Sequence, residues 1–267
     1  MRIALVSPYS WTYPGGVTRH IEALSDQFIA RGHDVTVLAP YDPDDALSPR
    51  LHRGARPQAR PLPAHLVSLG RSAGFSANGA QSNVALTPYA AATARRELML
   101  GGYDVVHLHE PVVPMAGWDT LGGACGVPLV GARRRMNRLA VRIAVSEAAA
   151  WTGRRFYGGR YRVIPNGVEV GEIPTRAPRA PGEPLRIAFV GQAVERKGLP
   201  VLLRAFEALR DHVPAELVIV GAGPEDVTAL LEEPAGITAL GKVDDERKLA
   251  VLRDADVLCA PSRTTSR

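Results

Sequence analysis

The sequence predicts an α/β protein with two Rossmann-like domains, each built on a parallel sheet, the second of them incomplete. Two segments begin alike, Arg2–Ser7 and Arg186–Gly191, and both are short runs rich in branched apolar residues. Each run is followed by a glycine-containing turn and then by a helical pattern, which is how a doubly wound domain begins. We therefore expect ligand-binding loops at the carboxyl ends of the strands, facing a cleft between the domains.

The composition is that of a globular protein without a membrane span. Of the 267 residues, 46% are hydrophobic, and the formal net charge is +5. The apolar run after Met1 is too short for a signal peptide, and no run reaches the length of a transmembrane helix, so we expect a cytoplasmic protein. The two cysteines have no metal-ligand spacing, and we expect no metal site. Arginines cluster at 50–60 and 133–142.

The first domain is predicted over residues 1–170. Its apolar runs are nearly continuous, which is typical of parallel strands covered on both faces. Ile21, Leu24 and Phe28 recur at helical spacing. A stretch rich in Pro, Gly and Arg, 42–79, predicts a long, weakly structured insertion. Strands are predicted at 3–6, 35–38, 105–108, 129–130, 142–145 and 162–164, and helices at 17–31, 88–100 and 146–157.

The second domain is predicted over residues 185–267, after a linker at 171–184 that is rich in Pro, Arg and Gly. Its strands are predicted at 187–190, 217–220, 237–240 and 257–260, and its helices at 199–210, 227–232 and 244–253. A doubly wound domain usually has about five or six strands. We therefore expect the second domain to be incomplete.

Two motifs mark the carboxyl ends of strands in the first domain. Pro14-Gly15-Gly16 precedes a helix, and glycine there lets backbone N–H groups approach an anion, although a plain tight turn is the alternative. His107, His109 and Glu110 lie at the end of another strand. A pair of histidines is usually structural, and the sequence offers no third metal ligand beside it.

Two further motifs mark strand ends in the second domain. Arg196 and Lys197 precede Gly198 at the start of a helix, where two cations can hold a phosphate, although a solvated turn is the alternative. A second glycine loop follows the next strand, but Asp226 stands where a dinucleotide-binding fingerprint requires glycine. This difference weighs against an NAD enzyme.

Taken together, these residues resemble the family-4 retaining glycosyltransferases, which have the GT-B fold. The resemblance covers nearly the whole chain and depends on the order and spacing of the motifs rather than on any one of them. Val6–Ser10 with Pro14–Val17 is most similar to the phosphatidylinositol α-mannosyltransferase branch. The matching segments are 2–9, 14–17 with His20, 32–33, 104–111, 142–146, 164–168, 195–198, 221–223, Gly241 with 244–245, and 255–262.

The resemblance implies transfer of a hexose, with GDP-mannose as the expected donor, to a lipid or inositol-type acceptor. It implies no cofactor, since the sugar nucleotide is a substrate, and no nucleic-acid partner; peripheral contact with an anionic membrane is expected. The donor would be bound by Gly16, Arg196, Lys197, Gly221, Gly241, Lys242 and Val243. The acceptor would be bound by Tyr9, Pro14, Gly15, Gly16, His20, His109 and Glu110.

The sequence departs from the family pattern in three places. The histidine that sits at the reaction centre in the family is missing after Val130. An acidic loop with a donor-binding glutamate, expected soon after Ser262, is absent, and Gln192 stands where relatives often carry arginine. We therefore expect sugar transfer by the chain as written to be impaired.

Other functions stay open at this point. One is a GT-B transferase with a different acceptor, such as a glycolipid or the inositol of a thiol precursor. Another, from a different class, is a non-catalytic remnant that binds nucleotide weakly. An NAD-linked dehydrogenase is disfavoured because the fingerprint is absent.

Overall fold

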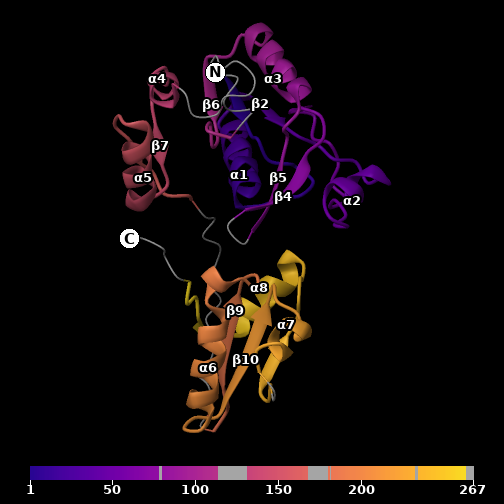
Figure 1. The fold of residues 1–267 in the computed structure, drawn as a ribbon, viewed down its shortest axis with the longest axis vertical. Coiled ribbons are helices and arrows are strands. Elements are labelled where there is room, and N and C mark those ends of the chain that lie inside the picture. Colours follow the sequence, from indigo (N-terminus) through magenta and orange to yellow (C-terminus); the bar gives the residue numbers. More distant parts are fainter. Residues whose placement is uncertain (78–79, 114–130, 168–179, 181, 232–233, 263–267) are drawn as a thin grey trace. The chain divides into compact units, whose positions relative to one another are not determined.

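The computed structural model describes residues 1–77, 80–113, 131–167, 180, 182–231 and 234–262 (Figure 1). It divides into two compact units, Met1–Val168 and Glu169–Arg267, and each is described by itself. Most of the predicted linker lies outside the described residues, so its boundaries stay a prediction. None of the helices in the described ranges is both long and apolar enough to cross a bilayer.

The first unit is built on a parallel sheet with the strand order β3-β2-β1-β6. Its strands are β1 (Arg2–Val6), β2 (Asp34–Ala39), β3 (Leu66–Ser68) and β6 (Val105–Leu108). The helices α1 (Gly16–Ala30) and α3 (Pro88–Leu100) follow as the sequence predicts. Thr87 caps α3, because its side chain accepts a hydrogen bond from the Ala90 amide at 3.2 Å.

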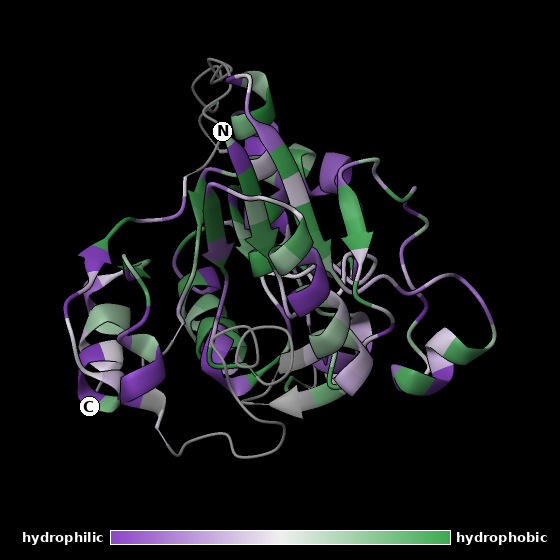
Figure 2. Ribbon diagram, turned by 90° about the horizontal axis from the view of Figure 1, so that it is seen from above, coloured by the Kyte–Doolittle hydropathy of each residue, from purple (hydrophilic) through white to green (hydrophobic). Residues whose placement is uncertain are grey.

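Both faces of this sheet are covered, which explains the continuous apolar runs of its central strands. Ile3 and Leu5 of β1 belong to a buried cluster with Ile21 of α1, whereas Val6 belongs to a second cluster with Ala90 of α3. Alternate residues of one strand therefore enter different cores. In Figure 2 the strands in the middle of this unit are largely green, the hydrophobic end of the scale.

The insertion at 42–79 is more ordered than the sequence predicts, and that expectation is wrong. It contains α2 (Leu47–Leu51), the edge strand β3, and β4 (Ala73–Ala77), which pairs antiparallel with β5 (Ala80–Val84). These elements are short and carry few β-branched residues, so they give little periodic signal.

The remainder of the first unit is a small helix–strand substructure. It consists of α4 (Ala132–Met136), β7 (Ile143–Ala144), α5 (Glu147–Tyr157) and β8 (Arg162–Val163), with β7 and β8 paired in parallel. Ser146 begins α5 by accepting a hydrogen bond from the Ala149 amide at 3.2 Å. The strand predicted at 129–130 lies outside the described residues, which resume at Gly131.

The second unit is also a parallel sheet, with the order β11-β10-β9-β12 among the described residues. The strands are β9 (Leu185–Val190), β10 (Ala215–Val220), β11 (Ile237–Ala239) and β12 (Val257–Leu258), and the helical segments are η1 (Glu195–Lys197), α6 (Leu199–Arg210), α7 (Pro224–Thr228) and α8 (Asp245–Asp254). Leu203 and Phe206 of α6 pack with Phe189, Leu217 and Ile219 in its core.

The helix predicted at 227–232 is misplaced, because α7 begins at Pro224 and ends at Thr228. Proline is favoured in the first turn of a helix, where its missing N–H costs nothing. Asp226 strengthens this start, since its carboxylate accepts a hydrogen bond from the Gly223 amide at 2.8 Å.

Candidate functional site

Four of the predicted acceptor-binding side chains in the first unit form two interacting pairs at the carboxyl ends of β1 and β6. The Tyr9 hydroxyl donates a hydrogen bond to Oε2 of Glu110. The imidazole rings of His20, from α1, and His109, after β6, meet edge to face with centroids 5.8 Å apart. These side chains come from three separate segments of the chain, and the parallel topology brings them to one edge of the sheet.

His109 is a buried imidazole at the end of β6. It is 9% exposed, and neither ring nitrogen has a partner in good hydrogen-bond geometry among the described residues. Its ring also stacks on that of His107 at 4.3 Å. Burial, and then the imidazoles of His107 and His20, lower the pKa of His109 to about 3, although the Val6 carbonyl opposes the shift.

His109 is therefore neutral at neutral pH, with one donor and one acceptor nitrogen. Such a pair matches a hydroxyl group, which can both accept and donate. Among the described residues no group of three or more His, Cys, Asp or Glu side chains could hold a metal ion. The sequence assignment of His109 to acceptor binding stays a prediction, and the chemistry favours a hydroxyl-bearing ligand.

Stability should fall in acid because of His109. A pKa of about 3 in the folded state, against about 6.5 unfolded, means that the unfolded state binds more protons between these values. Lowering the pH from 7 to 5 should then remove about 2 kcal/mol of unfolding free energy through this group. Urea unfolding at pH 7 and at pH 5 measures this drop in unfolding free energy. The drop should be smaller in His109→Gln than in the wild type. The control His212→Gln, at an exposed position, should show the same drop as the wild type. Equal losses in all three would contradict the assignment.

Glu110 is held in an unusual backbone conformation beside Tyr9. Its φ of +46° lies in the left-handed region, which residues other than glycine rarely adopt. The pKa of Tyr9 is raised, first by burial of the ring and then by the Glu110 carboxylate that accepts its proton in the hydrogen bond. Tyr9 thus stays protonated and can orient that carboxylate.

The two glycines at the start of α1 are not required by the fold. A Cβ atom added at Gly15 or Gly16 would meet no atom within 4 Å. Gly15 has φ −109° and ψ −169°, an extended conformation open to any residue. Pro14 and both glycines are only half-buried or exposed. Open space over backbone N–H groups at the start of a fifteen-residue helix is what close approach of an anionic ligand requires.

In the second unit, Arg196 and Lys197 follow β9 on the short helix η1. Arg196 is exposed and Lys197 is half-buried, and neither forms an ion pair within the described part of this chain. Gly198 then begins α6 with φ +73°. The two cations are therefore available to an anion at the carboxyl edge of the sheet.

The glycine loops after β10 and β11 are bonded directly to each other. The Gly221 amide donates to the Gly241 carbonyl at 2.7 Å, and the Gly241 amide donates to the Ala222 carbonyl at 2.9 Å. Gly221 has φ +98°, and a Cβ there would lie 2.6 Å from the Gly191 carbonyl oxygen. Unlike Gly16, Gly221 is thus explained by packing alone, whatever ligand the loop also binds.

The remaining predicted donor-binding residues lie at the same edge of this sheet. Lys242 is exposed and Val243 is half-buried, directly after Gly241. The Gly223 amide is already bonded to Asp226, so this N–H cannot also bind a phosphate. The structure therefore groups Arg196, Lys197, Gly221, Gly241 and the two residues after it around the ends of β9, β10 and β11.

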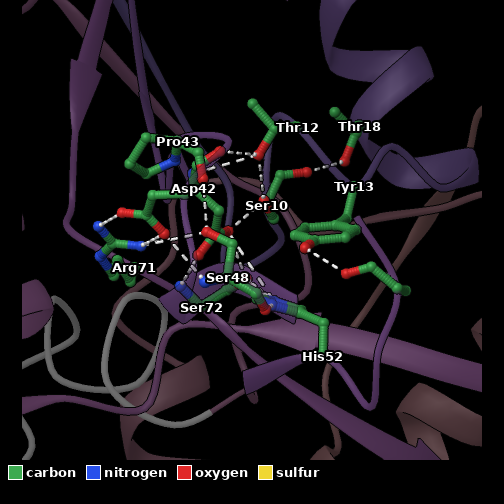
Figure 3. Close-up of polar contacts among 12 residues, drawn as sticks. Ser10, Thr12, Tyr13, Thr18, Asp42, Pro43, Ser48, His52, Arg71 and Ser72 are labelled. Carbon is green, nitrogen blue, oxygen red and sulfur yellow. Dashed lines mark hydrogen bonds and ion pairs between the residues drawn. The ribbon is translucent and has the colours of Figure 1, made fainter. Parts of the chain in front are cut away.

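Sequence reasoning missed a polar cluster centred on Asp42, whose hydrogen bonds are drawn in Figure 3. Asp42 and His52 are both fully buried. They interact with Ser10, Thr12 and Ser72, which are 30 or more positions from Asp42 in the sequence. Because these residues are far apart in the sequence, no local pattern predicts the cluster. The one available signal is the pair of small hydroxyl residues Ser10 and Thr12.

Comparisons with known proteins agree with two parallel α/β units. The family model "Glycosyltransferase Family 4" matches residues 14–133, and "Glycosyl transferases group 1" matches 184–267. The structure resembles that of WaaG, a glycosyltransferase involved in lipopolysaccharide biosynthesis, with a TM-score of 0.61, 16% identity and coverage of 98% of this chain and 75% of that one. The fold is therefore that of the GT-B glycosyltransferases.

Sequence relatives define the family more closely. The chain is 34% identical to a phosphatidyl-myo-inositol mannosyltransferase of Mycobacterium leprae over 98% of its own length and 72% of the relative's. It is 35% identical to the protein of that name from Mycobacterium tuberculosis, over 98% and 71% of the two chains. This chain belongs to glycosyltransferase family 4, as its motifs predict.

Proposed function

We propose that this protein transfers mannose from GDP-mannose to an inositol-type lipid acceptor. The observation that carries the proposal is the 34–35% identity, along 98% of the chain, to proteins named phosphatidyl-myo-inositol mannosyltransferase. The family assignment limits the reaction to glycosyl transfer; the sugar, the base and the acceptor are the proposed part.

The second unit supplies the support for a donor diphosphate. In family-4 chemistry the leaving group is a nucleoside diphosphate, and its developing charge must be stabilised by fixed cations or dipoles. Arg196 and Lys197 have no ion-pair partner among the described residues, and the loops of Gly221 and Gly241 are held rigidly beside them. A preorganised, cationic strand edge suits this task.

The first unit supplies the support for a polyol acceptor. Inositol presents hydroxyl groups, and the neutral imidazole of His109 with the Tyr9–Glu110 pair offers donors and acceptors for them. The backbone at Gly15 and Gly16 is open to a phosphate. The alternative from a different class of function is a non-catalytic protein that only binds nucleotide. The absence of the family histidine after Val130 favours this alternative.

A transfer assay separates these possibilities. The purified chain is incubated for hours with radiolabelled GDP-mannose and vesicles containing phosphatidylinositol, because impaired transfer would be slow. Label in the lipid phase, absent without phosphatidylinositol and reduced in Arg196→Ala, supports the transferase. Donor binding with no labelled lipid supports the non-catalytic alternative, and label that depends on another acceptor lipid overturns the inositol assignment.

A lipid acceptor also predicts binding to anionic membranes. Arg95 and Arg96 are exposed on α3, and each cation near an anionic surface contributes roughly 1 kcal/mol; Arg133 and Arg134 add further charge on α4. Sedimentation with phosphatidylinositol-containing vesicles should show binding that weakens as salt rises, and Arg95→Ala/Arg96→Ala should weaken it at low salt.

The matched control replaces two exposed arginines of the second unit, Arg247 and Arg253, and should bind as wild type. If wild type does not sediment with anionic vesicles at low salt, the membrane contact is wrong. If both double variants lose binding equally, the effect is one of net charge and not of α3.

A further inference from the structure

We propose that Asp42 is a positioning residue that fixes the loop between β1 and α1, residues 7–15, in the conformation that meets the acceptor. The part of the proposal that concerns the acceptor rests on the proposed function. The part that concerns the loop rests on the contacts of Asp42 alone.

Asp42 holds this loop through both its side chain and its backbone (Figure 3). The Ser10 hydroxyl donates to Oδ2 of Asp42 at 2.7 Å. The Thr12 hydroxyl donates to the Asp42 carbonyl at 2.9 Å and accepts from its amide at 3.1 Å. Two residues of the loop, separated by one position, are therefore bonded to one residue of the insertion.

The other side of the carboxylate is bonded to the segment before β4. Oδ1 of Asp42 accepts from the Ser72 amide at 2.9 Å, and Oδ2 accepts from the Ser72 hydroxyl at 2.7 Å. Nε2 of His52 lies 2.9 Å from the same hydroxyl oxygen. Asp42 thus joins the β1–α1 loop to the insertion, which adds β3 to the edge of the sheet.

A buried histidine lies beside the Asp42 carboxylate. Nδ1 of His52 lies 2.7 Å from the Ser48 carbonyl oxygen, and Nε2 lies 4.0 Å from Oδ2 of Asp42. The Tyr13 ring stacks on the imidazole with ring centroids 3.9 Å apart. His52 therefore extends the contacts of the Asp42 cluster to α2 and to Tyr13 of the β1–α1 loop.

The loop is also fixed on its far side. The Thr18 hydroxyl, in the first turns of α1, donates to the Ser10 carbonyl at 3.2 Å, and the Trp11 amide donates to the Pro40 carbonyl at 2.8 Å. Ser10 is therefore bonded both to Asp42 behind the loop and to the helix after Gly15 and Gly16. Without the Ser10–Asp42 bond, the loop before the exposed glycines would keep its bonds through Thr12 and Trp11 but would be held less firmly at Ser10. Preorganised loops bind more tightly because less freedom is lost on binding.

Two serine variants separate positioning from stability. Ser10→Ala removes the bond between loop and carboxylate, whereas Ser72→Ala removes a bond of the same length, 2.7 Å, on the insertion side. Asp42→Asn keeps the shape of the side chain. The control is Asp45→Asn, which removes the charge that pairs with Arg71 at the surface of the same insertion; an asparagine Oδ1 can still accept from the Leu47 and Ser48 amides.

Three quantities are measured for each variant: urea unfolding, hydrogen exchange of the peptide spanning residues 7–17, and calorimetric binding of myo-inositol 1-phosphate. We expect Ser10→Ala and Asp42→Asn to exchange faster over residues 7–17 and to bind about tenfold more weakly, the effect of one lost bond to a charged group. Ser72→Ala should lower the unfolding free energy as much as Ser10→Ala does. Its affinity for the probe should stay within about twofold of wild type, because substitutions at sites that do not interact usually have independent effects to within that range.

Affinity that follows stability in all four variants would overturn the positioning role and leave Asp42 a structural residue. Unchanged exchange over residues 7–17 in both Ser10→Ala and Asp42→Asn would overturn it as well, whether or not the probe binds. If wild type does not bind inositol phosphate while the loop exchange responds as expected, the acceptor assignment fails and the loop-fixing role of Asp42 stands.

Discussion

Replacing Arg196 and Lys197 together by alanine should weaken GDP binding by about 100-fold or more. A charge-assisted hydrogen bond contributes about 1.5–3 kcal/mol, and each factor of ten corresponds to about 1.4 kcal/mol. Neither side chain has an ion-pair partner among the described residues, so their removal leaves no buried charge unpaired and the fold should be kept. Calorimetric titration with GDP and with UDP measures the loss.

The matched control for this variant is Arg204→Ala, which removes an exposed arginine of α6 in the same unit. It should bind GDP as wild type does. Equal affinity of the wild type and the double variant would show that Arg196 and Lys197 are solvated surface residues, and the diphosphate assignment would then be wrong.

Replacing Gly221 by alanine should destabilise the second unit by about 2–6 kcal/mol. Its φ of +98° is one that residues with a side chain rarely adopt, and the new Cβ would lie 2.6 Å from a backbone oxygen of Gly191. Strain of this kind costs about 1–3 kcal/mol, and overpacking adds a similar amount. Chemical unfolding followed by circular dichroism measures the difference.

Gly16→Ala is the matched comparison, because it also adds one methyl group to a glycine at a strand-to-helix turn. The added Cβ meets no atom within 4 Å, and alanine favours the helix over glycine by about 0.5–1 kcal/mol. Stability should therefore stay the same or rise, while any phosphate-bearing ligand should bind more weakly. Similar destabilisation by both variants would contradict the distinction between a glycine required by packing and one left open for a ligand.

The sequence predicts the fold wherever burial leaves a local pattern. The helix at 88–100 and the helix at 199–210 have the bounds expected of them, because capping residues and apolar spacing both act within a few residues. The insertion at 42–79 could not be predicted in this way. Its order depends on Asp42, whose partners Ser10 and Ser72 are 32 and 30 positions away.

The candidate site likewise contains residues that a local sequence pattern predicts and features that depend on tertiary contacts. The motif residues Arg196, Lys197 and Gly241 could be named because strand ends and turns are visible in the sequence, and the structure places them at one sheet edge. The buried state of His109 depends on distant segments, because β6 pairs with β1 and the His109 ring meets that of His20 in α1. The left-handed backbone of Glu110 has no sequence signal either. No local pattern reports such packing.

We propose that the sheet edge formed by the loops after β9, β10 and β11 binds a sugar nucleotide. Binding is a more direct test than turnover, because it does not depend on the reaction centre. Calorimetry of the purified chain with GDP-mannose, UDP-glucose and NAD should show saturable one-to-one binding of GDP-mannose that is lost in Arg196→Ala/Lys197→Ala. No binding of either sugar nucleotide, or binding of NAD as tight as that of GDP-mannose, would contradict the account.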